Sequence, residues 1–424
     1  MKHEIPIEAA GPNGQAMADA ISSCVHCGFC LPSCPTYVEM GEEMDSPRGR
    51  IFLMKEALEG GLELETVLPY IDNCLGCQAC VTSCPSGVPY GDLITPFREY
   101  AEERRERPVP ERAQRALVLK TVAHPRRFRA AMRAGALARP IARFLPDSLS
   151  SLMRMVPRRL PPQGPGLPAV HPAQGGTPRA RVALLAGCAQ QVLAPDINWA
   201  TLRVLARNGI ETVVPAGQGC CGALAMHTGA ADEARRLARH NLTAFAGNGV
   251  DAVITNAAGC GSGMQEYGML FRGTDEEQAG EQLAGRVVDV STFLDSIGLT
   301  APVPALASPT LVAYQDACHL AHAQKVRSAP RALLEAIGNV TLVEPDEWEL
   351  CCGSAGTYNL EKPEVADRLG ARKARNLAAT GARIVTTGNI GCLTQLQTHL
   401  ATIGHDAEIM HTIQLLDRAY ARGA

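Results

Sequence analysis

The sequence predicts an α+β multidomain protein, in which a small α-helical, cysteine-rich domain precedes a duplicated α/β domain with parallel sheets. Three observations predict this architecture. The 424 residues are enough for two or three domains, the sixteen cysteines form two sets that are each internally repeated, and strand-like and helix-like segments alternate in the second half. We expect four parts, which are residues 1–100, a connector over 101–178, and two α/β repeats over 179–300 and 301–424.

The composition is that of a globular protein with no bias toward a polyanionic partner. Hydrophobic residues make up 46% of the chain, charged residues 20% and aromatic residues only 4%, and the formal net charge is −3. We therefore expect no nucleic-acid partner. The first residues, Met1-Lys2-His3-Glu4-Ile5-Pro6, are not followed by the apolar region of a signal peptide, and no apolar run is long enough to cross a bilayer. We expect a cytoplasmic protein whose cysteines bind metal rather than form disulfides.

The first eight cysteines form a motif that occurs twice, 50 residues apart. The two copies are Cys24-x2-Cys27-x2-Cys30-x3-Cys34-Pro35 and Cys74-x2-Cys77-x2-Cys80-x3-Cys84-Pro85. This spacing is typical of a ferredoxin-like domain with two [4Fe-4S] clusters, in which three cysteines of each copy bind one cluster and the fourth crosses to the other. We assign Cys24, Cys27, Cys30 and Cys84 to cluster 1, and Cys74, Cys77, Cys80 and Cys34 to cluster 2. Zinc also accepts paired cysteines, but a zinc site has no use for the third cysteine or for the Cys-Pro step.

Two arginines follow the first motif, in Ser46-Pro47-Arg48-Gly49-Arg50. Positive charge near a cluster stabilises the extra electron that reduction adds. Arg48 and Arg50 are therefore candidates for this role or for docking a partner. The alternative is an ordinary helix start in water, and the sequence does not separate these readings.

The connector contains a basic segment with apolar residues between the charges. Over residues 120–159 the only acid is Asp147, and the arginines are Arg126, Arg127, Arg129, Arg133, Arg139, Arg143, Arg154, Arg158 and Arg159. The interleaved apolar residues are Phe128, Met132, Ile141, Phe144 and Leu145. This pattern is typical of a helix that lies on an anionic membrane surface, although a solvated or partner-facing helix can have it too. A proline- and glycine-rich linker over residues 161–166 follows.

The other eight cysteines mark two copies of an α/β unit. Cys188, Cys220, Cys221 and Cys260 recur as Cys318, Cys351, Cys352 and Cys392, at offsets of 130 to 132 residues. Strands alternating with helices indicate parallel βαβ units. The expected strands are 181–186, 210–214, 251–256, 310–314, 340–343 and 383–387. The expected helices are 231–248, 329–337 and 363–380, with a further one between Pro195 and Gly209.

These eight later cysteines are candidate ligands of a further cluster or redox site. Cysteines at the strand ends of an α/β unit gather at one crevice, and Cys260 and Cys392 are expected at helix N-termini, where the helix dipole lowers the pKa of a thiol. The alternative is that they are buried structural cysteines, a common fate of this residue.

With both sets in place, the chain resembles the iron–sulfur subunits of glycolate oxidase, also called glycolate dehydrogenase. The resemblance covers nearly the whole chain. It rests on Cys24-Val25-His26-Cys27-Gly28-Phe29-Cys30, Cys34-Pro35-Thr36-Tyr37, Pro47-Arg48-Gly49-Arg50-Ile51, Cys84-Pro85-Ser86-Gly87-Val88, Gly187-Cys188-Ala189-Gln190, His322-Ala323-Gln324-Lys325 and Cys351-Cys352-Gly353-Ser354-Ala355-Gly356-Thr357-Tyr358.

This resemblance implies a subunit of an oxidoreductase complex with two [4Fe-4S] clusters and no flavin of its own. Flavin-containing partner subunits would oxidise glycolate to glyoxylate, and in some cases D-lactate to pyruvate. The chain would pass the electrons toward a membrane quinone from the cytoplasmic face of the inner membrane. It would hold no catalytic residue and turn over no substrate alone.

Three other functions remain open. One is the iron–sulfur subunit of anaerobic glycerol-3-phosphate dehydrogenase. Another is an oxidoreductase like heterodisulfide reductase, whose repeats the C-terminal half also resembles. In that pattern the last cysteine of each repeat is followed, at Cys-x2-Cys spacing, by one more cysteine. This chain has Gly263 at that position after Cys260, and Gln395 at that position after Cys392. The third is a non-enzymatic iron–sulfur sensor or scaffold.

Overall fold

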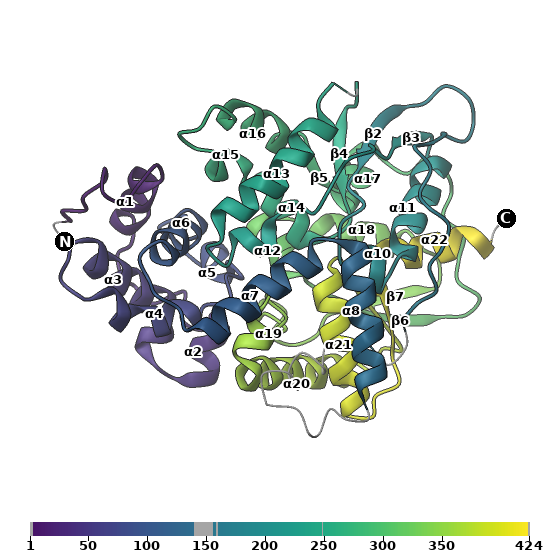
Figure 1. The fold of residues 1–424 in the computed structure, drawn as a ribbon. Coiled ribbons are helices and arrows are strands. Elements are labelled where there is room, and N and C mark those ends of the chain that lie inside the picture. Colours follow the sequence, from purple (N-terminus) through teal and green to yellow (C-terminus); the bar gives the residue numbers. More distant parts are fainter. Residues whose placement is uncertain (1–2, 140–155, 158–159, 248, 423–424) are drawn as a thin grey trace.

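The computed structural model describes residues 3–139, 156–157, 160–247 and 249–422. A helical N-terminal part lies beside two α/β units, and two connecting helices run along them (Figure 1). The predicted α+β fold class is confirmed. No helix among the described residues is both long and apolar enough to cross a membrane.

The N-terminal part consists of short helices packed around one apolar core. Its elements are α1 (Gly14–Ser22), α2 (Pro35–Met40), the short turn η1 (Glu43–Asp45), α3 (Pro47–Leu58), α4 (Leu64–Asp72), α5 (Ala79–Thr82) and α6 (Gly91–Glu102). Met17, Met54 and Phe97 are completely buried in the core. Ser46 caps α3 by accepting a 3.0 Å hydrogen bond from the Gly49 N–H. This core fixes the two cysteine loops, which lie between α1 and α2 and between α4 and α5.

The connector contributes α7 (Val109–Val122) and α8 (Pro125–Ala138), which pack on the first repeat. Phe128 on α8 is only 8% exposed. The neighbouring Arg129 donates hydrogen bonds to the carbonyls of Pro161 and Gln191, over 3.1 and 3.3 Å. Phe128 therefore faces the protein, so it is not part of an apolar surface offered to a membrane, one of the two readings of this segment. Ile141, Phe144 and Leu145 lie outside the described residues.

Each repeat has a sheet of four parallel strands in the same order, and the first sheet has one further edge strand. The strands are β1 (Val170–His171), β2 (Ala180–Leu184), β3 (Ile210–Val213), β4 (Ala252–Thr255) and β5 (Val287–Asp289), then β6 (Thr310–Gln315), β7 (Val340–Val343), β8 (Ile384–Thr387) and β9 (Glu408–His411). The orders are β1-β3-β2-β4-β5 and β7-β6-β8-β9. All neighbours are parallel except β1, which pairs antiparallel with β3 at the edge.

The register shows that the duplication is structural. Ala183 on β2 pairs with Val213 on one side and Val253 on the other. Ala313 on β6 pairs in the same way, with residues 343 and 385. All six expected strands are present, within two residues of the expected ends. Strands β1, β5 and β9 were not expected from the sequence.

Helices connect the strands and cover the sheets. In the first repeat they are α10 (Gln190–Leu193), α11 (Asp196–Arg207), α12 (Ala223–Met226), α13 (Ala231–Phe245), α14 (Ala258–Gln265), α15 (Tyr267–Leu270), α16 (Glu277–Ala284) and α17 (Val290–Ile297). In the second they are the π-helical turn η3 (His319–Ala323), α18 (Ser328–Glu335), α19 (Tyr358–Glu361), α20 (Pro363–Ala379), α21 (Ile390–Thr402) and α22 (Thr412–Arg422).

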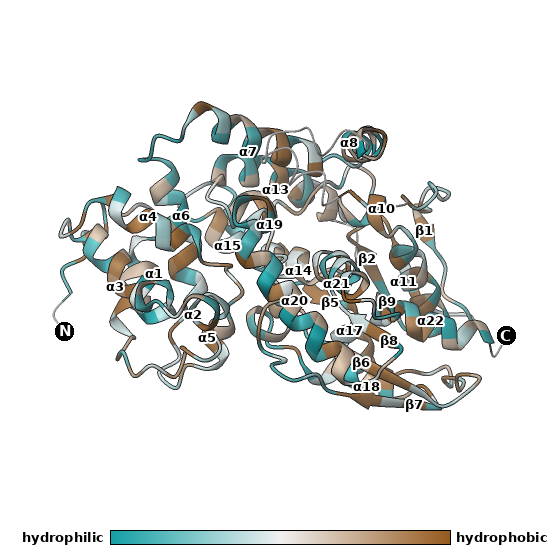
Figure 2. Ribbon diagram, turned by 90° about the horizontal axis from the view of Figure 1, so that it is seen from below, coloured by the Kyte–Doolittle hydropathy of each residue, from teal (hydrophilic) through white to brown (hydrophobic). Residues whose placement is uncertain are grey.

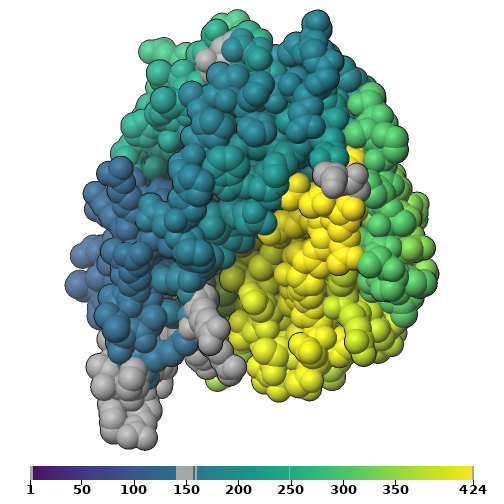
Figure 3. Space-filling model, turned by 90° about the vertical axis from the view of Figure 1, so that its right-hand side faces the viewer, coloured from purple at the N-terminus to yellow at the C-terminus, as the bar shows by residue number. Residues whose placement is uncertain are grey.

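The two repeats share a hydrophobic core and form one unit. Val182 and Ile254 of the first sheet belong to the same buried cluster as Val312 and Ile413 of the second repeat. Apolar residues line the strands, and the outer face of α20 is polar (Figure 2). Helix α22 lies against α11, where Arg203 and Asp417 form a 2.6 Å ion pair. Figure 3 shows the first repeat, in teal, meeting the yellow C-terminal helices along this side of the molecule.

Candidate metal centres

The first cysteine motif lies in a loop at the surface of the N-terminal part. Cys27 is exposed, Cys24 and Cys30 are half-buried, and Cys34 is buried at the start of α2. The pKa of Cys24 is raised, first by burial and also by the nearby thiolates of Cys84 and Cys27. Cys84 of the second motif therefore lies beside the first motif.

The second motif surrounds a small cavity together with one cysteine of the first motif. The thiols that line it are those of Cys34, Cys74, Cys77 and Cys80, and all four residues are buried. Four soft thiolate donors around an enclosed space fit a [4Fe-4S] cluster. Within the described part of the chain, no three His, Cys, Asp or Glu side chains converge closely enough to hold a single metal ion.

A buried arginine lines the same cavity. Arg50 is 1% exposed, forms a 2.9 Å ion pair with Asp45, and has a guanidinium nitrogen 3.8 Å from Cys34 Sγ. Burial raises the pKa of the Cys74 thiol, but the cations of Arg50 and Arg98 outweigh this effect, and the net pKa is lowered. Positive charge at this cavity favours ionised thiols, the form that binds metal.

The first repeat brings its four cysteines together at the carboxyl edge of its sheet. Cys188 follows β2, the Cys220–Cys221 pair follows β3, and Cys260 lies in the first turn of α14, as expected. The pKa of Cys220 lies well below its ordinary value because the Cys188 and Cys221 thiols hydrogen-bond to it. Cys221 also hydrogen-bonds with Cys260. The four thiols therefore form one continuous chain of contacts.

The second repeat has the same arrangement of thiols. Cys318 Sγ lies 3.9 Å from Cys351 Sγ, and Cys352 hydrogen-bonds with both Cys351 and Cys392. Cys392 lies in the first turn of α21. Three of these four residues are buried, and Cys318 is half-buried.

The second motif lies directly against this second thiol set. Cys77 and Cys351 belong to one apolar cluster. The pKa of Cys77 is raised well above its ordinary value by burial and then by the Cys318 thiolate. His319 joins the three parts, because its Nε2 donates to the Gly76 carbonyl over 3.1 Å and its Nδ1 accepts from Ser262 Oγ over 2.9 Å. Gly76 belongs to the second motif and Ser262 to the first repeat.

Family models match both halves of this arrangement. A "4Fe-4S dicluster domain" matches residues 20–88, and a "Cysteine-rich domain" matches residues 182–265 and 312–397. The chain is 37% identical to the glycolate oxidase iron-sulfur subunit of Escherichia coli (strain K12), over 96% of both chains. It is 35% identical to a probable glycolate oxidase iron-sulfur subunit of Bacillus subtilis (strain 168), over 93% of both chains. The chain belongs to this family.

The family assignment establishes an iron–sulfur protein that serves an oxidoreductase complex, as the sequence analysis predicted. The fold has a solved counterpart. A hypothetical protein from Helicobacter pylori superposes with a TM-score of 0.54 at 10% identity, over 96% of this chain and 72% of that protein. At this identity the likeness concerns the fold alone.

The two Cys-Cys-Gly turns of this chain both require their glycine. Gly222 and Gly353 both have left-handed backbones, with φ of 81° and 83°. A Cβ on Gly353 would meet the Ala366 carbonyl oxygen at 2.6 Å, and one on Gly222 would meet the Ala234 carbonyl oxygen at 3.0 Å. Helices α20 and α13 therefore pack closely on these turns.

The structure also explains one departure from the heterodisulfide reductase pattern. A Cβ on Gly263 would lie 2.4 Å from the Ala223 Cβ, so a cysteine does not fit there without movement of α12. At the matching position of the second repeat, the Gln395 side chain hydrogen-bonds to the Ala366 carbonyl and to His399. The first repeat therefore has no room for a fifth thiol in its present form, and in the second repeat a hydrogen-bonded glutamine takes that position.

Two cations near the thiols were missed by the sequence analysis. Arg98 on α6 donates hydrogen bonds to the carbonyls of Cys74 and His227. No motif surrounds Arg98, so the sequence carries no signal for it. Lys373 is buried on α20, and its amine donates a hydrogen bond to the Glu347 carbonyl. Burial lowers the pKa of Lys373, and the nearby Cys352 and Cys351 thiolates partly offset this effect. Lys373 lies four residues from both Leu369 and Leu377, so the three side chains share one face of α20. This spacing could have indicated from the sequence that the lysine is buried.

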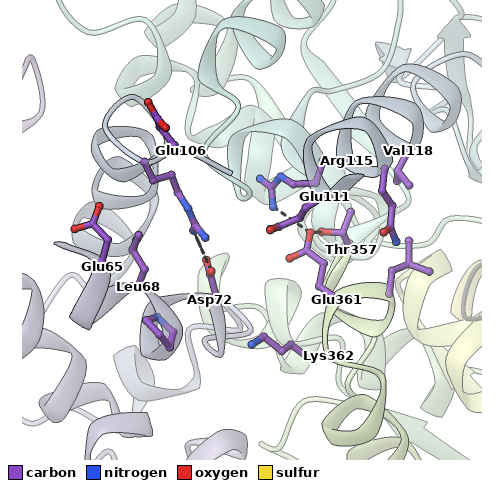
Figure 4. A pocket seen from close by; sticks show the side chains of 14 residues that line it. Glu65, Leu68, Asp72, Glu106, Glu111, Arg115, Val118, Thr357, Glu361 and Lys362 are labelled. Carbon is purple, nitrogen blue, oxygen red and sulfur yellow. Dashed lines mark hydrogen bonds and ion pairs between the residues drawn. The ribbon is translucent and has the colours of Figure 1, made fainter. Parts of the chain in front are cut away.

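A separate open pocket lies where the N-terminal part, the connector and the second repeat meet (Figure 4). Ion pairs cross its walls, between Arg105 and Asp72 at 3.0 Å and between Arg115 and Glu361 at 3.0 Å. It contains no cysteine. Its charged pairs link the connector to both neighbouring parts.

Proposed function

We propose that this chain is the iron–sulfur electron-transfer subunit of a membrane-associated glycolate dehydrogenase. Electrons reach it one at a time from a flavin-containing partner subunit that oxidises glycolate to glyoxylate, or D-lactate to pyruvate, and leave toward quinone. Cys24, Cys27, Cys30 and Cys84 hold one cluster, and Cys74, Cys77, Cys80 and Cys34 hold the other. When bound, a [4Fe-4S] cluster accepts and releases single electrons.

The observation that carries this proposal is that the thiol sets neighbour one another in succession. The Cys84 thiolate acts on Cys24, the second motif shares its cavity with Cys34, and Cys77 lies against Cys318. A route for electrons therefore leads from the exposed loop of the first motif through the interior to the second repeat. The second repeat's set of Cys318, Cys351, Cys352 and Cys392 is the candidate for a further cluster, and the set of Cys188, Cys220, Cys221 and Cys260 has the same composition.

Two near-full-length relatives are named for glycolate oxidase, which favours glycolate over glycerol-3-phosphate or a heterodisulfide as the source of electrons. The proposal also includes attachment to the cytoplasmic face of the inner membrane. The exposed arginines of α8, Arg126, Arg127 and Arg133, are suited to an anionic surface.

The test uses a tagged chain purified anaerobically from its own host with whatever subunits accompany it. Addition of glycolate, D-lactate or glycerol-3-phosphate should reduce the clusters, as seen by EPR, with glycolate the most effective. Cys77→Ser should abolish the signal of the inner cluster and stop transfer to quinone, while Cys188→Ser leaves both N-terminal signals intact. Reduction by glycerol-3-phosphate alone, or by none of the three, would refute the glycolate assignment.

A further inference from the structure

The loop of the first motif is the one place where a cysteine reaches the surface fully. Of the sixteen cysteines, all within the described residues, Cys27 alone is exposed. Val25 and Phe29, each two residues from Cys27 in the motif, are 67% and 66% exposed. Large apolar side chains so open to water, next to a candidate redox ligand, are typical of a surface that another molecule covers.

The loop holds these side chains outward in a fixed conformation. His26 has a left-handed backbone, with φ of 55°, and Gly28 follows with φ of 89°. The Arg48 guanidinium donates a 3.0 Å hydrogen bond to the His26 carbonyl and forms a 2.6 Å ion pair with Glu43. The Arg48 guanidinium thus ties the His26 carbonyl to Glu43, which holds the backbone of the loop and leaves less of it to be ordered on binding.

We propose that this loop, residues 24–30, is the surface on which the flavin-containing partner docks and through which electrons enter the chain. The proposal rests on the function proposed above and adds the place of the donor. A reduced flavin gives up two electrons in two single steps and releases its protons to solvent, and each step reduces the first cluster by one electron, which then passes inward to the second. The enzyme's terminal acceptor reoxidises the chain.

The chemistry of the loop fits a protein rather than a free quinone. Small apolar molecules bind in concave, enclosed pockets, and the loop has its apolar side chains projecting into water. Protein interfaces use aromatic and aliphatic side chains of this kind as anchors, and electron-transfer contacts are small. Electron tunnelling also weakens steeply with distance, so the donor must approach the exposed ligand Cys27 rather than the buried thiols of the second motif.

The test compares tagged chains purified with their subunits from the native host. The variant is Val25→Ser combined with Phe29→Ser, and Phe29→Glu alone is a second variant. Leu137→Ser is the matched control, because Leu137 is 83% exposed and belongs to α8, a helix that lies away from the N-terminal part in Figure 1. For each chain we would measure iron content, EPR signals after dithionite, co-purified flavin, and the rate of cluster reduction by glycolate.

Both loop variants should retain iron and dithionite-reduced signals, because the changed side chains lie in solvent. Their co-purified flavin and the rate of glycolate-driven reduction should fall about tenfold or more, while Leu137→Ser behaves as the wild type. Unchanged flavin and rate in both loop variants would overturn the docking surface, as would equal loss in Leu137→Ser. If the wild-type chain itself brings no flavin and is not reduced by glycolate, the proposed function fails, which is a separate result.

Discussion

His319 of the second repeat donates a hydrogen bond from Nε2 to the carbonyl of Gly76 in the second cysteine motif, over 3.1 Å. The same ring accepts a hydrogen bond from Ser262, so three parts of the chain meet at one half-buried imidazole. His319→Leu keeps the volume but leaves the Gly76 carbonyl unpaired, and we expect a loss of about 1–3 kcal/mol in the free energy of unfolding. Denaturant titration checks this. His405→Leu, which removes a weaker 3.4 Å contact to Ala382, is the control and should cost less.

Arg50 should set the potential of the inner cluster. Its cation lies beside Cys34 and acts on Cys74, and both belong to the proposed ligand set of cluster 2. Arg50→Gln removes this charge, so the midpoint potential of that cluster should become more negative in an EPR-monitored redox titration. Arg50→Lys should retain most of the wild-type value.

The matched control for Arg50→Gln is Arg48→Gln, which removes a positive charge beside the first motif instead of the second. Arg48 contacts the loop carbonyl of His26 and belongs to the same helix, but its side chain is partly exposed. The signal of the inner cluster should be unchanged in this variant. A shift of equal size in both variants would show that Arg50 has no special role.

The glycine of the second Cys-Cys-Gly turn should not tolerate a side chain. Gly353→Ala places a Cβ 2.6 Å from the Ala366 oxygen in a left-handed backbone, and we expect a loss of about 1–3 kcal/mol in stability. Gly404→Ala has a similar φ, of 73°, but meets nothing within 4 Å, and should cost about 1 kcal/mol or less. Thermal unfolding of the two variants measures the difference, and equal losses would contradict the close packing of α20 on the turn.

Stability should fall on mild acidification, partly because of His411. Burial lowers its pKa to about 4, whereas in the unfolded chain it is about 6.5. Below about pH 6.5 the unfolded state takes up a proton that the folded state refuses, so stability is lost from there down to about pH 4. At about pH 5.5 the loss from this residue should be about 1 kcal/mol. His411→Gln should flatten the curve of unfolding free energy by that amount, and an unchanged slope would show that His411 does not carry the effect.

The sequence predicts the architecture well because its signals are local. Spacing of Cys-x2-Cys identifies the N-terminal domain, and apolar runs that end at cysteines identify the central strands β2, β4, β6 and β8. Strands β5 and β9 lie beyond the last cysteine of each repeat, are short, and include Asp289 and Glu408, so the pattern does not mark them. Their place in the sheet comes from pairing with β4 and β8.

Contacts between distant parts are what the sequence could not provide. Nothing in the spacing indicates that Cys77 would lie against Cys351, or that Phe128 of the basic segment would be buried. Both arise from packing between elements that are far apart in the chain. The exposure of Val25 and Phe29 is equally invisible in the sequence, because apolar residues inside a cysteine motif could as well belong to its core.

Iron and sulfide analysis tests most directly whether the N-terminal motifs hold two [4Fe-4S] clusters. Iron and acid-labile sulfide should be determined on the anaerobically purified chain, with EPR after reduction. We expect about eight irons and eight sulfides from these motifs, with magnetically coupled signals that are lost in Cys24→Ser and Cys74→Ser. Additional iron whose signal survives these changes but disappears in Cys351→Ser would place a further cluster in the second repeat. Zinc without sulfide, in protein that has never met oxygen, would contradict the claim.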